Sequence, residues 1–206
     1  MILKKKVTKS DFQPFLTHTM YKKYVIFYLF LFFMPPIILN AQKIGEKTNL
    51  FYGASTTPNI GIETSFSRRW TVDLLAGYNP WSFSGETSLR HWLVRAEPRF
   101  WLWTPFMGHF LGIHGMYARY NIGNLPFGGD LEKYTFKGDV FGGGFSYGYH
   151  FILKGRWGLE LSFGLGYLKF SYDKFTCKDC RELQGSYTRN YIGPTRVGIS
   201  LIYMLQ

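Results

Sequence analysis

The sequence predicts an all-β protein: an eight-stranded antiparallel up-and-down transmembrane β-barrel, preceded by an N-terminal signal peptide. The prediction rests on alternating side chains, connections of alternating length, and tryptophans near strand ends. The clearest strand places Trp157, Leu159, Leu161, Phe163, Leu165 and Tyr167 on one face and Gly158, Glu160, Ser162, Gly164 and Gly166 on the other. Successive side chains of a strand leave opposite faces. An apolar face opposite a small and charged one is typical of a membrane barrel, with lipid outside and a polar lumen.

The N-terminus resembles an export signal. The apolar run from Tyr24 to Leu39 follows Lys22 and Lys23 and precedes Ala41. A charged segment, an apolar segment and a small residue predict a signal peptide over residues 1–41. The run is too short, and too rich in proline, for a spanning helix of about 20 residues. Met20 fits the start of such a signal better than Met1. The barrel is then expected over residues 42–206.

Composition is consistent with one exported β-domain. The chain has 206 residues, of which 46% are hydrophobic and 20% aromatic, with a formal net charge of +11. Removing residues 1–41 leaves 18 basic residues (24 − 6) and 12 acidic residues (13 − 1), a net charge of +6. Much of the basicity therefore belongs to the export signal, and no nucleic-acid partner is expected.

Eight strands follow in order. Each shows the alternation of bulky apolar residues with glycine, serine or charged residues. The predicted ranges are 47–54, 59–67, 70–79, 91–102, 109–120, 138–152, 157–171 and 191–204. Most reach the ~9–11 residues that a tilted strand needs to cross a bilayer.

The connections differ in length on the two sides. Those after the second, fourth and sixth strands are short, whereas loops 80–90, 121–137 and 172–190 are longer. Outer-membrane barrels have short periplasmic turns and longer extracellular loops. We therefore expect the outer membrane of a Gram-negative bacterium as the location, with membrane lipids including lipopolysaccharide and the barrel-assembly machinery as partners.

Tryptophans fall near both ends of the predicted strands. Indole rings favour the level of the lipid headgroups, so they predict two interfacial aromatic girdles. The six residues expected there are Trp70, Trp81, Trp92, Trp101, Trp103 and Trp157.

The row opposite the bulky residues carries the ionised side chains. It contains Glu63, Asp73, Arg95, Glu97, Arg99, Glu160 and Arg196, with His114 and His150. An eight-stranded barrel is only wide enough for side chains to fill it. Because buried charges must pair, we expect an Arg–carboxylate network that plugs the lumen. A lipocalin-like ligand-binding barrel would instead turn the bulky row inward. The glycine-rich polar row favours the tight interior of a membrane barrel.

Two further groups are candidate sites. Cys177 and Cys180 are separated by two residues in a loop of an exported chain, which predicts a local disulfide. A lone pair of cysteines supplies too few ligands for zinc, so no metal and no cofactor are expected. Ser88 and His91, near Glu86, are the only nucleophile and base at an outer strand end. An outer-membrane lipid-modifying enzyme of the deacylase or acyltransferase kind is thus the alternative function, and a triad would require a specific geometry.

Several stretches resemble a known family. They are Lys47–Leu50, Thr57–Glu63, Gly77–Trp81, His91–Val94, Gly108–Gly112 and Tyr191–Thr195. The pairing of Asn79-Pro80-Trp81 with His91-Trp92-Leu93-Val94 is the most specific. Together they resemble a Bacteroides-type outer-membrane barrel family catalogued as domain of unknown function 3575. The resemblance implies an outer-membrane barrel and no catalytic residues. We expect a non-enzymatic structural or surface-interaction protein, with contacts made by extracellular loops on a rigid scaffold.

Overall fold

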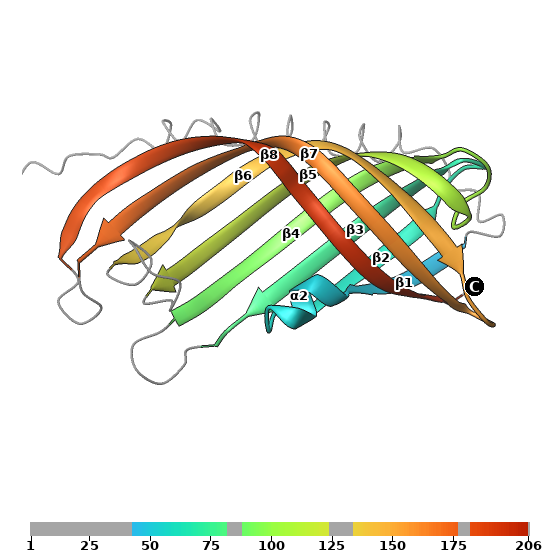
Figure 1. Ribbon diagram of the computed structural model, residues 1–206, viewed down its shortest axis with the longest axis horizontal. Helices are drawn as coiled ribbons and strands as arrows, with labels where there is room; N and C mark the ends of the chain where they lie inside the picture. Colours follow the sequence, from blue (N-terminus) through green and yellow to red (C-terminus); the bar gives the residue numbers. More distant parts are fainter. Residues whose placement is uncertain (1–42, 82–87, 124–133, 177–181, 206) are drawn as a thin grey trace, which may run out of the picture. The chain divides into compact units, whose positions relative to one another are not determined.

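The structure is a computed structural model that describes residues 43–81, 88–123, 134–176 and 182–205. These residues form eight strands and one short helix (Figure 1). The elements are β1 (Ile44–Asn49), α2 (Leu50–Ala54), β2 (Asn59–Ser65), β3 (Trp70–Asn79), β4 (Ser88–Trp101), β5 (Gly108–Gly123), β6 (Thr135–Ile152), β7 (Trp157–Phe175) and β8 (Leu183–Met204). The predicted signal peptide, with Met20, and Cys177, Cys180 and Glu86 lie outside the described residues.

Each strand pairs antiparallel with the next one in the chain, and β1 pairs with β8. The sheet is therefore a closed barrel of consecutive strands, which confirms the predicted fold class of eight antiparallel strands. We call the end that carries the turns after β2, β4 and β6 the turn end, and the opposite end the loop end. Residues 43 and 205 both lie at the turn end, because β1 begins and β8 finishes there.

The first predicted strand, 47–54, is wrong in its second half, because residues 50–54 form helix α2. Asn49 ends the strand and acts as the helix N-cap, with its side-chain oxygen accepting the N–H of Phe51 at 3.0 Å. Asparagine is favoured at this position because it satisfies an N–H that the helix leaves unpaired. The side-chain oxygen of Asn59 accepts the N–H of Asn49 at 2.7 Å and fixes the same corner from β2.

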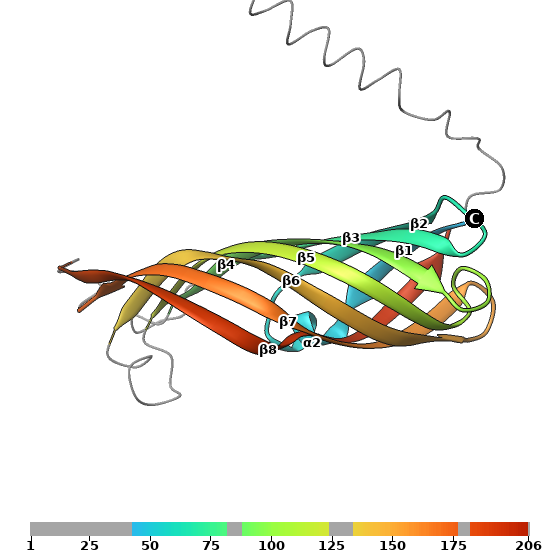
Figure 2. The same cartoon turned by 90° about the horizontal axis from the view of Figure 1, so that it is seen from above.

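The strands lengthen steadily around the barrel, from 6 residues in β1 to 22 in β8. Most of the predicted loop 172–190 is therefore strand, since β7 runs to Phe175 and β8 begins at Leu183. Strands β4 and β6 also begin earlier than predicted, and β5 runs later. The reason is that neighbouring strands stay paired beyond the predicted ends, as between Lys137 and Asp173 and between Tyr172 and Tyr187. Figures 1 and 2 show β4–β8 running past β1–β3 toward the loop end.

The outward face of the wall is apolar over the half nearer the turn end. Its exposed large side chains include Ile60, Ile62, Leu74, Val94, Leu111, Ile113, Phe145, Leu161, Phe163, Leu165 and Val197. We call this surface the apolar belt. Phe145 is 73% exposed, which is unusual for a phenylalanine unless something apolar covers it. The bulky row thus faces outward, the reverse of a lipocalin-like interior.

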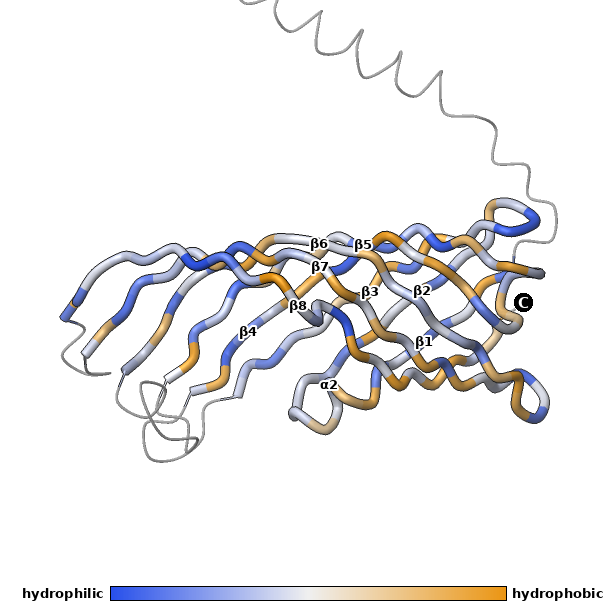
Figure 3. Tube along the Cα trace, turned by 45° about the horizontal axis from the view of Figure 1, so that its top comes forward, coloured by the Kyte–Doolittle hydropathy of each residue, from blue (hydrophilic) through white to orange (hydrophobic). Residues whose placement is uncertain are grey.

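Toward the loop end, the outward residues become polar. They include Arg90, Arg119, Lys137, Asp139, Lys169, Ser171 and Asn190. Arg119 donates to Asp139 at 2.7 Å, and this hydrogen bond holds the pKa of the Asp139 carboxyl below its ordinary value. The hydropathy colouring of Figure 3 shows the same change, with hydrophilic residues gathering where β4–β8 extend past the other strands. No helix among the described residues is long and apolar enough to cross a membrane.

Candidate functional site

The interior of the barrel holds a network of ionised side chains near its middle. All seven charged residues expected in the lumen are buried there: Glu63, Asp73, Arg95, Glu97, Arg99, Glu160 and Arg196. Arg99 lies at the centre and contacts carboxylates from four strands. Its nitrogens lie 2.5 Å from Glu63, 2.8 Å from Asp73, 3.0 Å from Glu97 and 2.8 Å from Glu160. Arg196 pairs with Glu97 and, at 3.1 Å, with Glu160.

The sequence reasoning missed one member of this network, Lys47 on β1. Its ammonium lies 2.6 Å from Glu63, 3.3 Å from Asp73 and 3.3 Å from Glu160, and its side chain is fully buried. Lys47 raises the cations to four (Lys47, Arg95, Arg99, Arg196), equal to the four carboxylates (Glu63, Asp73, Glu97, Glu160). We call these eight residues the ion-pair network. The sequence does indicate this position, because Lys47 and Asn49 are two residues apart and therefore lie on the same, inward face of β1.

The glycines of the inward row make room for this network. A Cβ on Gly61 would lie 2.7 Å from Cγ of Lys47, and one on Gly112 would lie 2.6 Å from a carboxylate oxygen of Glu97. Both distances are shorter than van der Waals contact, so a side chain at either position would displace a member of the network. The expectation that glycine marks a tightly filled interior therefore has a specific cause at these two positions.

An aromatic cap closes the lumen at the turn end. It consists of Trp101, Phe106, Phe110 and His150. The Trp101 and Phe110 rings are 5.0 Å apart, and the Arg99 guanidinium lies 4.4 Å above the Phe110 ring. This cation–π contact joins the cap to the ion-pair network.

Trp101 corrects the predicted girdle. It is fully buried, and its indole N–H donates to the Thr71 hydroxyl at 2.9 Å inside the barrel. The reason is that every second residue of a strand lies on the same face. Because Arg95, Glu97 and Arg99 face inward on β4, residue 101 faces inward too. The other five tryptophans, Trp70, Trp81, Trp92, Trp103 and Trp157, are each at least 38% exposed.

An apolar layer lies on the loop-end side of the ion-pair network. It consists of Leu75, Leu93, Ala118, Val140 and Leu168, which pack together inside the barrel, with Tyr52 of α2 against them. The sequence does not distinguish these residues as a layer. Each is a single apolar residue in an inward row of glycines, polar and charged residues, and the five are far apart in the chain. From the turn end, the lumen therefore contains an aromatic cap, the ion-pair network and the apolar layer.

The two inward histidines lie on either side of the network. His114 shares a hydrogen bond of 2.8 Å with the Thr195 hydroxyl, and His150 belongs to the aromatic cap. Among the described residues, no group of three or more histidines, cysteines or carboxylates is arranged to hold a metal ion.

The alternative enzymatic pair is not joined by a hydrogen bond. The Ser88 hydroxyl donates to the Asn121 carbonyl at 3.4 Å, and Nε2 of His91 lies 3.2 Å from the Thr57 hydroxyl. Each group thus has a partner other than its supposed catalytic neighbour.

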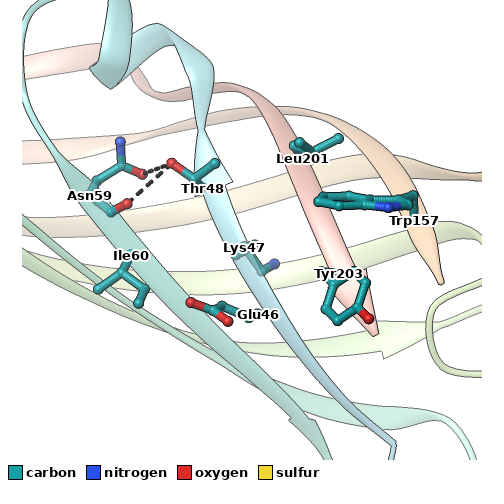
Figure 4. Close-up of a pocket in the computed structure, with 8 residues that line it drawn as sticks. All are labelled: Glu46, Lys47, Thr48, Asn59, Ile60, Trp157, Leu201 and Tyr203. Atoms are coloured by element: carbon teal, nitrogen blue, oxygen red, sulfur yellow. Dashed lines mark hydrogen bonds between the residues drawn. The ribbon is translucent and has the colours of Figure 1, made fainter. Parts of the chain in front are cut away.

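The outer wall is hollowed over β1, where a depression of about 490 Å³ is bounded by Trp157, Ile60 and Tyr203 (Figure 4). Its floor carries Glu46 and Thr48, whose hydroxyl donates to the Asn59 carbonyl at 3.1 Å. Glu46 is an outward carboxylate on the half of the wall that carries the apolar belt. It pairs across strands with Tyr203, which pairs with Trp157, so it lies in a row that carries aromatic residues of the turn end.

The fold and its interior define a class of protein: a small closed barrel of eight antiparallel strands, filled by a charge-balanced network and apolar on its outer wall. The chain belongs to the family described as "Protein of unknown function (DUF3575)", whose model matches residues 26–205. The comparison with curated proteins and the comparison with solved structures each found no similar chain.

Proposed function

We propose that this protein is a small outer-membrane β-barrel with a plugged lumen, and that its role is structural or one of surface interaction rather than catalysis. The observation that carries the proposal is that the barrel wall has its apolar face outward and its charged face inward, the reverse of a protein that folds in water. Large apolar side chains face outward, while eight ionised side chains are buried inside. In water, this arrangement would expose hydrocarbon and desolvate charge, and both cost free energy. In a bilayer, the same arrangement satisfies both surfaces.

The ends of the belt support the same orientation in a membrane. Trp70, Trp103 and Trp157 are exposed at the turn end, and Tyr78, Trp92 and Tyr167 are exposed farther toward the loop end. Aromatic residues at both borders of an apolar band are typical of bilayer interfaces. The outward polar residues beyond Trp92 then belong to the external medium, and the turn end faces the periplasm. Lipids, including lipopolysaccharide, and the barrel-assembly machinery are the partners that such a location entails.

The outward carboxylate of Glu46 is compatible with this location. Acidic residues cost less than basic ones on a lipid-facing barrel wall, and the cost falls toward the interfaces. Glu46 shares its row with Tyr203 and Trp157, the residues that suit an interface.

The test is membrane fractionation with a heat-modifiability gel. We expect the protein in the outer-membrane fraction, migrating faster in unheated than in heated detergent, because a closed barrel keeps its ladder of hydrogen bonds in mild detergent. A matched variant replaces Phe145, Phe163 and Leu165 of the belt by serine and should lose membrane insertion. The same number of serines at the outward residues Lys137, Lys169 and Asn190 should not. Recovery of the unaltered chain from the periplasm as a soluble protein would overturn the proposal.

A further inference from the structure

A groove opens on the inner face of the sheet at the loop end, beyond the apolar layer. Its volume is about 710 Å³, and its lining comes from β4, β5, β6, β7 and β8. Most lining side chains are aromatic or aliphatic, and four of them make ring contacts. The Tyr120 and Phe170 rings are 6.5 Å apart, and those of Phe136 and Tyr172 are 5.7 Å apart.

Along one side of this groove, β8 has no second strand partner within the described ranges. β8 pairs with β1 only over Ser200–Met204, so residues 183–199 of β8 have no β1 partner. β3 likewise ends at Asn79, opposite His91 of β4. Toward the loop end, the wall is therefore a curved sheet of β4–β8, and its concave face carries the lining.

The charge of the groove is positive. Arg189 of β8 lines it, and its cross-strand neighbour on β7 is Phe170. No carboxylate belongs to the lining, and within the described part of the chain Arg189 makes no ion pair. The other titratable residues among the described lining are three tyrosines and His91, and Nε2 of His91 lies 3.2 Å from the Thr57 hydroxyl. Asp139 of β6 and Asp173 of β7 belong to the outward rows of their strands, on the opposite face of the sheet from the groove.

These features specify a ligand. A volume of this size and an apolar aromatic lining with a few polar groups, here with Arg189 as the permanent charge, are typical of small-molecule sites. A guanidinium binds a carboxylate through two parallel hydrogen bonds, and it also stacks on flat rings. We propose that the groove binds a small aromatic molecule that carries one carboxylate, with the carboxylate paired to Arg189 and the rings placed against Tyr120, Phe170 and Tyr172.

The source of the ligand is the external medium. The outward faces of the strands that form the groove carry Arg90, Arg119, Lys137 and Lys169, which are exposed and polar. This part of the wall thus lies beyond the apolar belt, and the apolar layer and ion-pair network close the lumen beneath it. The inference rests on the proposed function only for this placement, since binding can be measured on the isolated protein.

The experiment is calorimetric titration of the protein, produced from the full chain and reconstituted in phosphatidylcholine nanodiscs, with empty nanodiscs as the baseline. The probes are 2-naphthoate and the neutral 2-naphthamide, which have the same rings and nearly the same shape. We expect saturable binding of naphthoate and binding of naphthamide weaker by about tenfold, because only the carboxylate accepts charge-assisted hydrogen bonds.

Two substitutions of the same residue type separate the groove from the rest of the surface. Arg189→Gln should abolish the preference for naphthoate, and Arg189→Lys should retain part of it. Arg90→Gln removes the same charge at the same end, from the opposite face, and should retain the full preference. The heat-modifiability gel identifies any variant that fails to fold, and it also reports separately on the proposed membrane barrel.

Three results would overturn the inference. One is equal affinity for naphthoate and naphthamide, and another is an equal loss in Arg189→Gln and Arg90→Gln. The third is loss of naphthoate binding when anionic lipid is added to the nanodiscs, which would assign the groove to lipid instead of a free molecule.

Discussion

Lys47 determines the charge of the interior. Without it, the buried side chains would comprise four carboxylates and three guanidiniums, and one carboxylate charge would remain uncompensated in a closed lumen. Its ammonium lies between Glu63, Asp73 and Glu160, and Gly61 leaves the space that its side chain occupies. Removing one partner of a buried ion pair is strongly destabilising because it leaves an unpaired charge.

We therefore expect Lys47→Met to lower the free energy of unfolding by about 3–5 kcal/mol. The measurement is urea unfolding of the reconstituted barrel, followed by tryptophan fluorescence. Lys43→Met, at an exposed position just before β1, is the control and should leave the unfolding midpoint unchanged.

The double variant Lys47→Met with Glu63→Gln tests the cause of the loss. It restores an equal number of positive and negative charges, so it should recover part of the lost stability. A Lys47→Met protein as stable as the unaltered one would show that the fourth cation does not stabilise the network.

At the scale of elements, β1 is the strand with the fewest paired residues, and its pairing with β8 closes the ring. β1 pairs with β8 over five residues and with β2 over four, whereas β6 and β7 pair over 18. A barrel has no free edges only if this closure holds. The capping of α2 by Asn49 and the bond from Asn59 to the Asn49 N–H secure the end of β1.

We expect amide hydrogens of residues 44–49 to exchange with solvent earlier than those of 140–150 on β6, because local opening has a lower free energy where fewer pairs must break. Hydrogen exchange of the reconstituted protein, read by mass spectrometry, measures this. Asn59→Ala removes both side-chain bonds to the Asn49 backbone and should increase exchange in β1 alone. Equal protection of β1 and β6 would contradict the expectation.

For the whole molecule, three successive layers fill the lumen. The aromatic cap lies at the turn end, the ion-pair network in the middle and the apolar layer toward the loop end. An eight-stranded barrel is narrow enough for side chains to fill. Each layer consists of buried side chains that occupy the lumen at a different level.

The purified protein is therefore expected to give no steady conductance in a planar bilayer. Arg99→Ala removes the central side chain of the network, and Phe110→Ala removes the ring that links it to the cap. Neither should open a large channel, because other layers remain. A stable open channel in the unaltered protein would mean that the lumen is not closed.

The sequence also predicted most of this arrangement and failed in ways that have physical reasons. Alternation identified all eight strands and seven of the eight charged residues inside, because the two faces of a strand face different surroundings. Trp101 stands near a strand end, where a girdle is expected, but it faces inward because it alternates in step with Arg99 along β4. The predicted strand 47–54 includes residues 50–54, which form a helix because Asn49 caps it.

The amino-acid sequence by itself determined the class of fold, the number of strands and the face that carries charge, since these depend on a two-residue period that is local. Only the tertiary structure decided which charges meet, that Lys47 balances them, and where the long strands of β4–β8 form a groove. These depend on the stagger between strands, because pairing register brings residues together that are far apart in the chain, as Arg99 and Glu160 are.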